Sequence, residues 1–170
     1  MKKVFLLFAS LLGVLFSYAQ GDQKHFNFEN MSMGSNRDTL VFQMGYNFGW
    51  KTLSREGSVE ALKGEYCECE CDILILYTPI TKRPVRMTLL IKSHPSLIDA
   101  NYKVFRDRYI KTYGNPFSVK TLTKDIDIWK IEGAGVMMLS KTFEGAIEVE
   151  VNDELNRASY FNEAELVVNK

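Results

Sequence analysis

The sequence predicts an α+β fold: an antiparallel sheet with two helices packed on one face. Three observations predict it. An amphipathic segment with helix start and stop signals covers about 97–113, most other segments alternate between apolar and polar residues, and short turns separate those segments. Alternation with a period of two is typical of half-buried strands, so we expect the helices to lie on a sheet.

The first 19 residues have the pattern of an export signal. Lys2 and Lys3 precede an almost wholly apolar run over 4–16, and Ser17 and Ala19 supply the small residues at −3 and −1 of a cleavage site after Ala19. The apolar run is short for a membrane span, and no stop-transfer segment follows it. Because residue 20 is Gln20 rather than cysteine, the sequence argues against a lipoprotein. We therefore expect a periplasmic or secreted protein without a membrane span.

The remaining chain, 20–170, has the length of one globular domain and contains no linker-like segment. The full chain has 21 basic and 21 acidic residues, so loss of Lys2 and Lys3 with the export signal leaves a slightly negative charge. A charge of that sign argues against nucleic acid and anionic membrane surfaces as partners.

The first half of the domain begins with a possible edge strand in the F-N-F alternation within 20–34. An S-x-x-D signal at Ser35 and Asp38 predicts the start of a short helix over about 36–44, and Gly45 is placed to end it. A turn at 55–58 follows. The strands predicted after this turn cover 61–68, 71–78 and 85–91, with a turn at 79–84 before the last of them.

The second half begins with the long helix. Ser96 and Asp99 form an S-x-x-D capping box, and Gly114 and Pro116 end the helix. Residues at steps of three and four form its apolar stripe: Ile98, Tyr102, Phe105, Tyr109 and Tyr113.

The strands expected after the long helix cover 117–122, 126–131, 136–141 and 147–151, with a hairpin turn at 132–135. Each half thus consists of a helix, a glycine stop and several antiparallel strands. We interpret the halves, about 26–91 and 96–151, as a tandem repeat. The tail 152–170 fits either a short helix or an irregular segment.

Several short motifs follow one another in a distinctive order. They are F-x-F, a capped helix ending in Gly45 and Tyr46, L-x-G-x-Y at Leu62, Gly64 and Tyr66, K-x-Y-G-x-P at Lys111, Tyr113, Gly114 and Pro116, and a strand with Trp129. In this order of motifs the chain resembles a group of small exported bacterial proteins. Their fold is similar to that of the β-lactamase inhibitory protein and of the SmpA/OmlA outer-membrane assembly lipoprotein. The resemblance implies a helix-on-sheet domain, built of two repeats, that binds proteins.

Cys67, Cys69 and Cys71 form the most unusual run, C-E-C-E-C-D. In a single strand the three thiols share one face and are small buried side chains. If the chain turns near 68–70, Cys67 and Cys71 face each other and a disulfide becomes possible. A metal or redox role is a third alternative, although the spacing differs from the C-x₂₋₄-C of zinc sites.

No catalytic signature is recognisable. The two histidines, His25 and His94, are expected in surface loops, and no nucleophile elbow, P-loop, dinucleotide fingerprint or zinc-protease motif occurs. Acidic pairs such as Glu148 and Glu150 alternate with apolar residues, as on the solvated face of a strand. We therefore predict no catalytic residues, no metal and no cofactor.

Tyr46, Phe48 and Trp50 form an aromatic cluster after the first helix. Tyr and Trp are enriched at interface hot spots, so this cluster is a candidate partner-binding surface. The alternative is that Phe48 and Trp50 pack between helix and sheet. Together these features predict an exported, non-enzymatic binding protein of unknown partner, with a protein favoured as that partner. A secreted inhibitor of a hydrolase and an unrecognised extracytoplasmic enzyme remain the alternatives.

Overall fold

A computed structural model describes residues 24–142 and 145–168, so the predicted export signal lies outside the described residues. It confirms the α+β class: an eight-stranded antiparallel sheet, a two-stranded hairpin and three helices. The small hairpin consists of β1 (Asn27–Phe28) and β2 (Met31–Ser32). The large sheet contains β3 (Lys51–Glu56), β4 (Val59–Tyr66), β5 (Cys69–Tyr77), β6 (Pro84–Lys92), β7 (Phe117–Lys120), β8 (Lys124–Ile131), β9 (Gly135–Thr142) and β10 (Ala146–Asp153).

The large sheet is built from two meanders. Helix α2 (Arg37–Phe48) precedes β3 to β6, and helix α3 (Ile98–Tyr113) precedes β7 to β10. The strand order is β3-β4-β5-β6-β10-β9-β8-β7, so the last strands of both meanders pair at the centre. Seven residue pairs join β6 to β10, and the sheet is therefore continuous.

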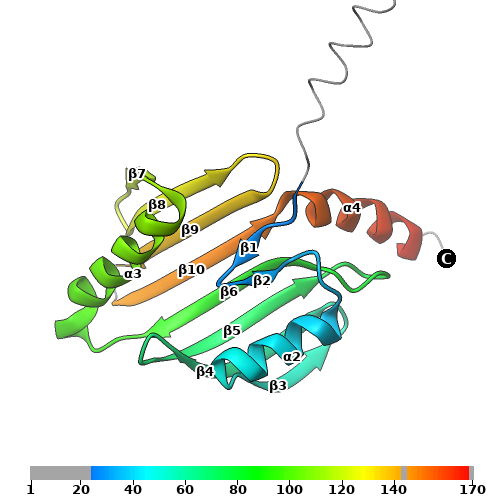
Figure 1. Ribbon diagram of the computed structural model, residues 1–170, viewed down its shortest axis with the longest axis horizontal. Helices are drawn as coiled ribbons and strands as arrows, with labels where there is room; N and C mark the ends of the chain where they lie inside the picture. Colours follow the sequence, from blue (N-terminus) through cyan, green and yellow to red (C-terminus); the bar gives the residue numbers. More distant parts are fainter. Residues whose placement is uncertain (1–23, 143–144, 169–170) are drawn as a thin grey trace, which may run out of the picture.

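One face of the sheet is covered by α2, α3 and the β1–β2 hairpin, which lies between the two helices (Figure 1). On the central strands every second side chain points into this layer and is fully buried, as Ile73, Ile75, Leu89 and Val149 show. Each such side chain contributes about 1.5–3 kcal/mol by leaving water. The core is therefore a single layer between helices and sheet.

Helix α2 begins and ends at other residues than the sequence predicts. Its N-cap is Asn36, whose side chain accepts a hydrogen bond from the Thr39 backbone N–H at 2.9 Å, so the cap predicted at Ser35 is wrong. The helix passes through Gly45 and ends at Gly49, which has a φ of 68°. A Cβ at Gly45 would have 3.7 Å to its nearest neighbour, so nothing forces the helix to stop there.

Helix α3 confirms the predicted long helix, but its start differs from the predicted capping box. Ser96 lies in a short 3-10 helix, η1 (Pro95–Leu97), where the His94 ring accepts from the Ser96 backbone N–H. The N-cap of α3 makes no side-chain hydrogen bond. Proline suits the first turn of a helix, so Pro95 starts the helical path before Ser96 can act as a cap. The Asp99 carboxylate instead pairs with Lys141.

The chain after β10 forms helix α4 (Glu154–Val168), which settles the tail as helical. Asp153 is fully buried and accepts a hydrogen bond from the Asn156 backbone N–H at 2.8 Å, an N-cap arrangement. The helix follows β10 directly and extends past the end of the sheet (Figure 1). Within 24–142 and 145–168, no helix has the combined length and apolar character needed to cross a bilayer.

Candidate binding surface

The sheet face that points away from α2 and α3 is not covered by those helices, and we call it the open face. Its residues follow from strand register. The first row, nearest α4, consists of Leu76, Arg86, Asn152, Val136 and Lys130, which pair across β5, β6, β10, β9 and β8. The second row consists of Leu74, Thr88, Glu150, Met138, Ile128 and Phe117.

Several large apolar side chains are exposed on the open face. Leu74 is 43% exposed, Leu90 38% and Phe117 71%, and the residues that alternate with Leu74 and Leu90 along their strands are buried. In a one-sided antiparallel sheet the outer positions are normally polar. Contiguous exposed apolar residues rimmed by charges are typical of interaction surfaces.

At the end of the open face remote from α4, the charges neutralise one another. The Lys92 ammonium lies 3.1 Å from Asp72 and 3.5 Å from Glu70, and Lys63 also pairs with Glu70. These side chains are about half exposed, so each pair contributes little to stability. They nevertheless engage both lysines, Lys63 and Lys92, in ion pairs.

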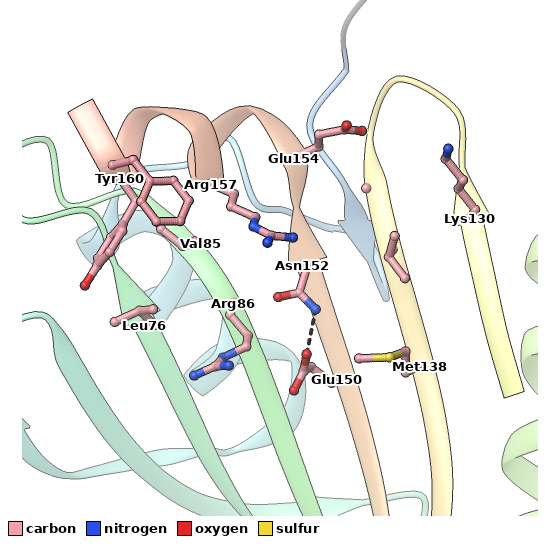
Figure 2. A pocket seen from close by; sticks show the side chains of 13 residues that line it. Leu76, Val85, Arg86, Lys130, Met138, Glu150, Asn152, Glu154, Arg157 and Tyr160 are labelled. Atoms are coloured by element: carbon pink, nitrogen blue, oxygen red, sulfur yellow. Dashed lines mark hydrogen bonds between the residues drawn. The ribbon is translucent and has the colours of Figure 1, made fainter. Parts of the chain in front are cut away.

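At the opposite end, α4 and the first row enclose a groove of about 690 Å³. Tyr160, Phe161 and Arg157 of α4 form one wall, and Figure 2 shows Arg157 and Arg86 in the groove beside Asn152. The other lining residues come from the sheet and the start of α4: Leu76, Val85, Lys130, Gly135, Val136, Met138, Glu150 and Glu154.

The basic side chains of the groove have no ion-pair partner within 24–142 and 145–168. Arg86, Lys130 and Arg157 form no salt bridge among the described residues, in contrast to the paired charges at the far end. Glu150 is engaged, since it accepts a hydrogen bond of 2.7 Å from the Asn152 side-chain amide (Figure 2). The groove therefore combines two guanidinium groups with polar and apolar side chains of the sheet.

Helix α4 is held in place by two buried polar contacts. The Asn156 amide donates to the backbone carbonyls of Met33 and Pro84 at 2.7 and 2.9 Å. Near the other end of the helix, Glu163 accepts from the backbone N–H groups of Ile80 and Thr81. Burial opposes ionisation of Glu163, but these hydrogen bonds outweigh it and lower its pKa. The α4 wall of the groove is therefore preformed.

The predicted aromatic cluster divides between surface and core. Tyr46 is 82% exposed on α2 and stacks on Phe42, with ring centroids 6.2 Å apart. Trp50 is buried and donates from its indole N–H to the Glu65 carbonyl at 2.8 Å, and half-buried Phe48 stacks on it. Phe48 and Trp50 thus pack between helix and sheet. Tyr46 lies on the helix-covered side of the sheet, away from the open face.

The cysteine run is divided by a tight turn. Cys67 and Glu68 have φ values of 49° and 65° and connect β4 to β5, so the turn lies at 67–68 and not at 68–70. Cys71 therefore pairs with Gly64, and all three thiols are free. Burial raises the pKa of Cys71 to about 12. Such a thiol remains protonated at neutral pH and is a poor nucleophile or metal ligand.

Both histidines make local polar contacts. The His25 Nδ1 lies 3.2 Å from the buried Asp153 carboxylate, and His94 binds Ser96 in η1. No group of three His, Cys, Asp or Glu side chains within the described ranges is arranged to hold a metal ion.

Searches of protein-family models, curated proteins and solved structures find no match to this chain. The open face and its groove therefore rest on geometry alone. Sequence reasoning missed this surface because it concentrated on clustered aromatics. The available signal was the apolar Leu74 and Leu90 at positions where the strand alternation calls for polar residues.

Proposed function

We propose that this protein is an exported, non-enzymatic binding protein whose open face binds a protein partner. One observation carries the proposal: Leu74, Leu90 and Phe117 remain exposed on a sheet face that neither α2 nor α3 covers. Burying these side chains against a partner would release them from water, and this is the main favourable term in protein association.

The composition of the open face supports a protein partner. Apolar residues of the second row lie between a charged end and a basic groove, and interfaces combine an apolar centre with a polar rim in the same way. The tyrosines whose pKa values burial raises, such as Tyr66 and Tyr109, lie in the core under the helices and not on the open face. An enzyme would be expected to gather such groups in its cleft.

The experiment compares two pairs of substitutions on opposite sides of the protein. Tagged protein is used to capture partners from its own cell envelope, followed by mass spectrometry. The test variant is Leu74→Lys with Leu90→Lys on the open face, and the matched control is Phe42→Lys with Tyr46→Lys on α2. Both pairs replace exposed apolar residues by lysine.

We expect the wild type and the α2 control to capture the same protein and the open-face variant to lose it. Loss with the α2 pair and retention with the open-face pair would instead assign binding to the predicted aromatic cluster. A captured hydrolase whose activity falls on binding would identify the protein as an inhibitor.

We further propose that the two halves of the domain are a tandem repeat. Each half consists of a helix followed by four antiparallel strands. In both halves the first strand after the helix lies at an edge of the sheet and the last one lies at its centre. A tandem repeat is also what the proposed relation to the β-lactamase inhibitory protein implies.

A pair of buried acids supports this repeat. Glu60 and Asp127 each lie on the second strand of a meander and face the helix layer. Each accepts from a helix arginine and an edge-strand hydroxyl: Glu60 from Arg37 at 3.0 Å and Thr52 at 2.9 Å, and Asp127 from Arg106 at 2.7 Å and Ser118. A crystal structure tests the proposal, because the rotation that superposes 37–92 on 98–153 should bring the two carboxylates together. If they remain on different strands after superposition, the repeat is refuted.

A further inference from the structure

We propose that the groove between the first row and α4 binds an organic carboxylate that carries an aromatic or branched apolar group. Arg86 and Arg157 supply guanidinium groups from a central strand and from α4, and Leu76, Tyr160 and Phe161 supply apolar surface. This inference goes beyond the proposed function. It concerns a small ligand and holds whether or not a protein occupies the rest of the open face.

The charges of the groove favour an anion. Three basic side chains line it against two carboxylates, and Glu150 already accepts from the Asn152 amide. Arg86 and Arg157 line one groove and form no ion pair among the described residues, so a bound anion would interact favourably with both. A guanidinium group presents two parallel N–H donors that match the two oxygens of a carboxylate.

The size and walls of the groove favour a ligand with an apolar body. A volume of about 690 Å³ falls within the range of small-molecule sites, whereas a bare inorganic anion would fill little of it. Beside the arginines lie the Tyr160 and Phe161 rings and the Leu76 and Val85 side chains. Such surface accommodates an aromatic or branched group next to the bound carboxylate.

The groove is also fixed before a ligand arrives. Arg86 belongs to a strand that pairs on both sides, with Leu76 opposite it on β5 and Asn152 opposite it on β10. Helix α4 is held at Asn156 and Glu163 by the buried hydrogen bonds described above. A preformed site loses little conformational entropy on binding.

The test uses two probes that differ only in the charged group. N-acetyl-L-phenylalanine carries the carboxylate, and N-acetyl-L-phenylalaninamide is its neutral counterpart. Both are titrated into the purified protein at neutral pH, with calorimetry for affinity and amide NMR shifts for location. We expect the acid to bind at least tenfold more tightly than the amide, with shifts concentrated at the first row and α4.

Substitutions then assign the site. Arg86→Gln and Arg157→Gln should each weaken binding of the acid at least tenfold. Arg157→Lys should lose part of that affinity, because lysine keeps the positive charge but lacks the two parallel N–H donors of a guanidinium group. Lys51→Gln, on the edge strand β3, removes one positive charge far from the groove and should leave binding unchanged. The NMR spectrum of each variant shows whether it is folded.

The proposal is overturned if the acid does not bind at millimolar concentration, if the amide binds as tightly, or if Lys51→Gln lowers affinity as much as Arg157→Gln. Displacement by an equal concentration of inorganic phosphate would also overturn it, since the apolar body would then contribute nothing. None of these results bears on the partner-capture experiment, because the lysine substitutions there leave both arginines in place.

Discussion

Glu60→Gln is the substitution that tests the buried polar layer most directly. The Glu60 carboxylate is fully buried between β4 and α2. It accepts hydrogen bonds from Arg37 at 3.0 Å, Arg55 at 2.8 Å and Thr52 at 2.9 Å. Glutamine has nearly the same shape but one acceptor oxygen and no charge, so packing is preserved while the ion pairs are lost.

The magnitude follows from the exposure of the two arginines. The Arg37 side chain is only 18% exposed, so its charge would be left without a partner in a largely dry site. Breaking a buried pair in this way costs about 3–5 kcal/mol. The Arg55 side chain is 49% exposed, so solvent screens its pair with Glu60 and this pair contributes little. Because glutamine can still accept one hydrogen bond, we expect Glu60→Gln to lower the free energy of unfolding by about 2–4 kcal/mol.

The pH dependence gives a second readout. Burial opposes ionisation of Glu60, but the hydrogen bonds from Arg37, Arg55 and Thr52 outweigh it and lower its pKa from the usual value of a glutamate. A carboxyl whose pKa is lowered in the folded state stabilises the protein above its unfolded pKa, and this contribution is lost as the pH falls through the folded value. The difference between wild type and Glu60→Gln should therefore be full at pH 7 and shrink below about pH 4.5.

Urea unfolding monitored by circular dichroism at pH 7 and at pH 3 measures both effects. Glu65→Gln is the matched control, because Glu65 lies on the same strand with its side chain exposed. That control should change the free energy of unfolding by no more than about 0.5 kcal/mol. A loss below about 1 kcal/mol in Glu60→Gln, or an equal loss at both pH values, would refute a stabilising role for the ion pairs.

The other predictions concern the room for a methyl group at two glycines and the accessibility of the cysteine thiols. A Cβ at Gly64 would lie 2.2 Å from the buried Trp50 ring, so Gly64→Ala should lower the free energy of unfolding by about 1–3 kcal/mol. Gly45 lies inside α2, and a Cβ there would have its nearest neighbour at 3.7 Å, so Gly45→Ala should raise the free energy of unfolding by about 0.5–1 kcal/mol. A decrease would show that the site does not have room for a methyl group. Iodoacetamide labelling of the native protein at pH 8 should modify exposed Cys67 first and leave buried Cys71 unmodified. Equal labelling rates, or a mass two daltons below that of the fully reduced chain, would contradict three free thiols with Cys71 protected.

Much of the fold follows from local sequence signals. Helix α3 was predicted within one residue because Gly114 and Pro116 mark its end and a regular aromatic stripe marks its buried face. Strand β3 was not predicted, since it lies at the sheet edge with all six residues exposed and has no apolar alternation to reveal it. The pairing of β6 with β10 depends on contacts between distant parts of the chain, which periodicity does not record.

The candidate binding surface is harder to predict, because it depends on contacts between residues far apart in the sequence. Trp50 resembles a surface anchor in sequence, but Gly64 on the neighbouring strand leaves the space in which its ring is buried. The groove combines Arg86 with Arg157, which are 71 positions apart and meet only because α4 begins directly after β10, beside the first row. Arg86 belongs to a short basic segment with Lys82 and Arg83, which is visible in the sequence, but nothing in the sequence places Arg157 beside it.

The uneven pairing of charges along the open face constrains how a partner can bind. At the end remote from α4, Lys92 is already neutralised by Asp72 and Glu70, so a partner's charges would gain little there and would have to displace existing pairs. At the α4 end, Arg86 and Arg157 have no such partner among the described residues, and a carboxylate gains the full interaction. In the proposed complex, burial of the apolar side chains of the second row would depend little on the orientation of the partner. The electrostatic difference between the ends therefore favours one orientation, with the acidic side of the partner over the groove.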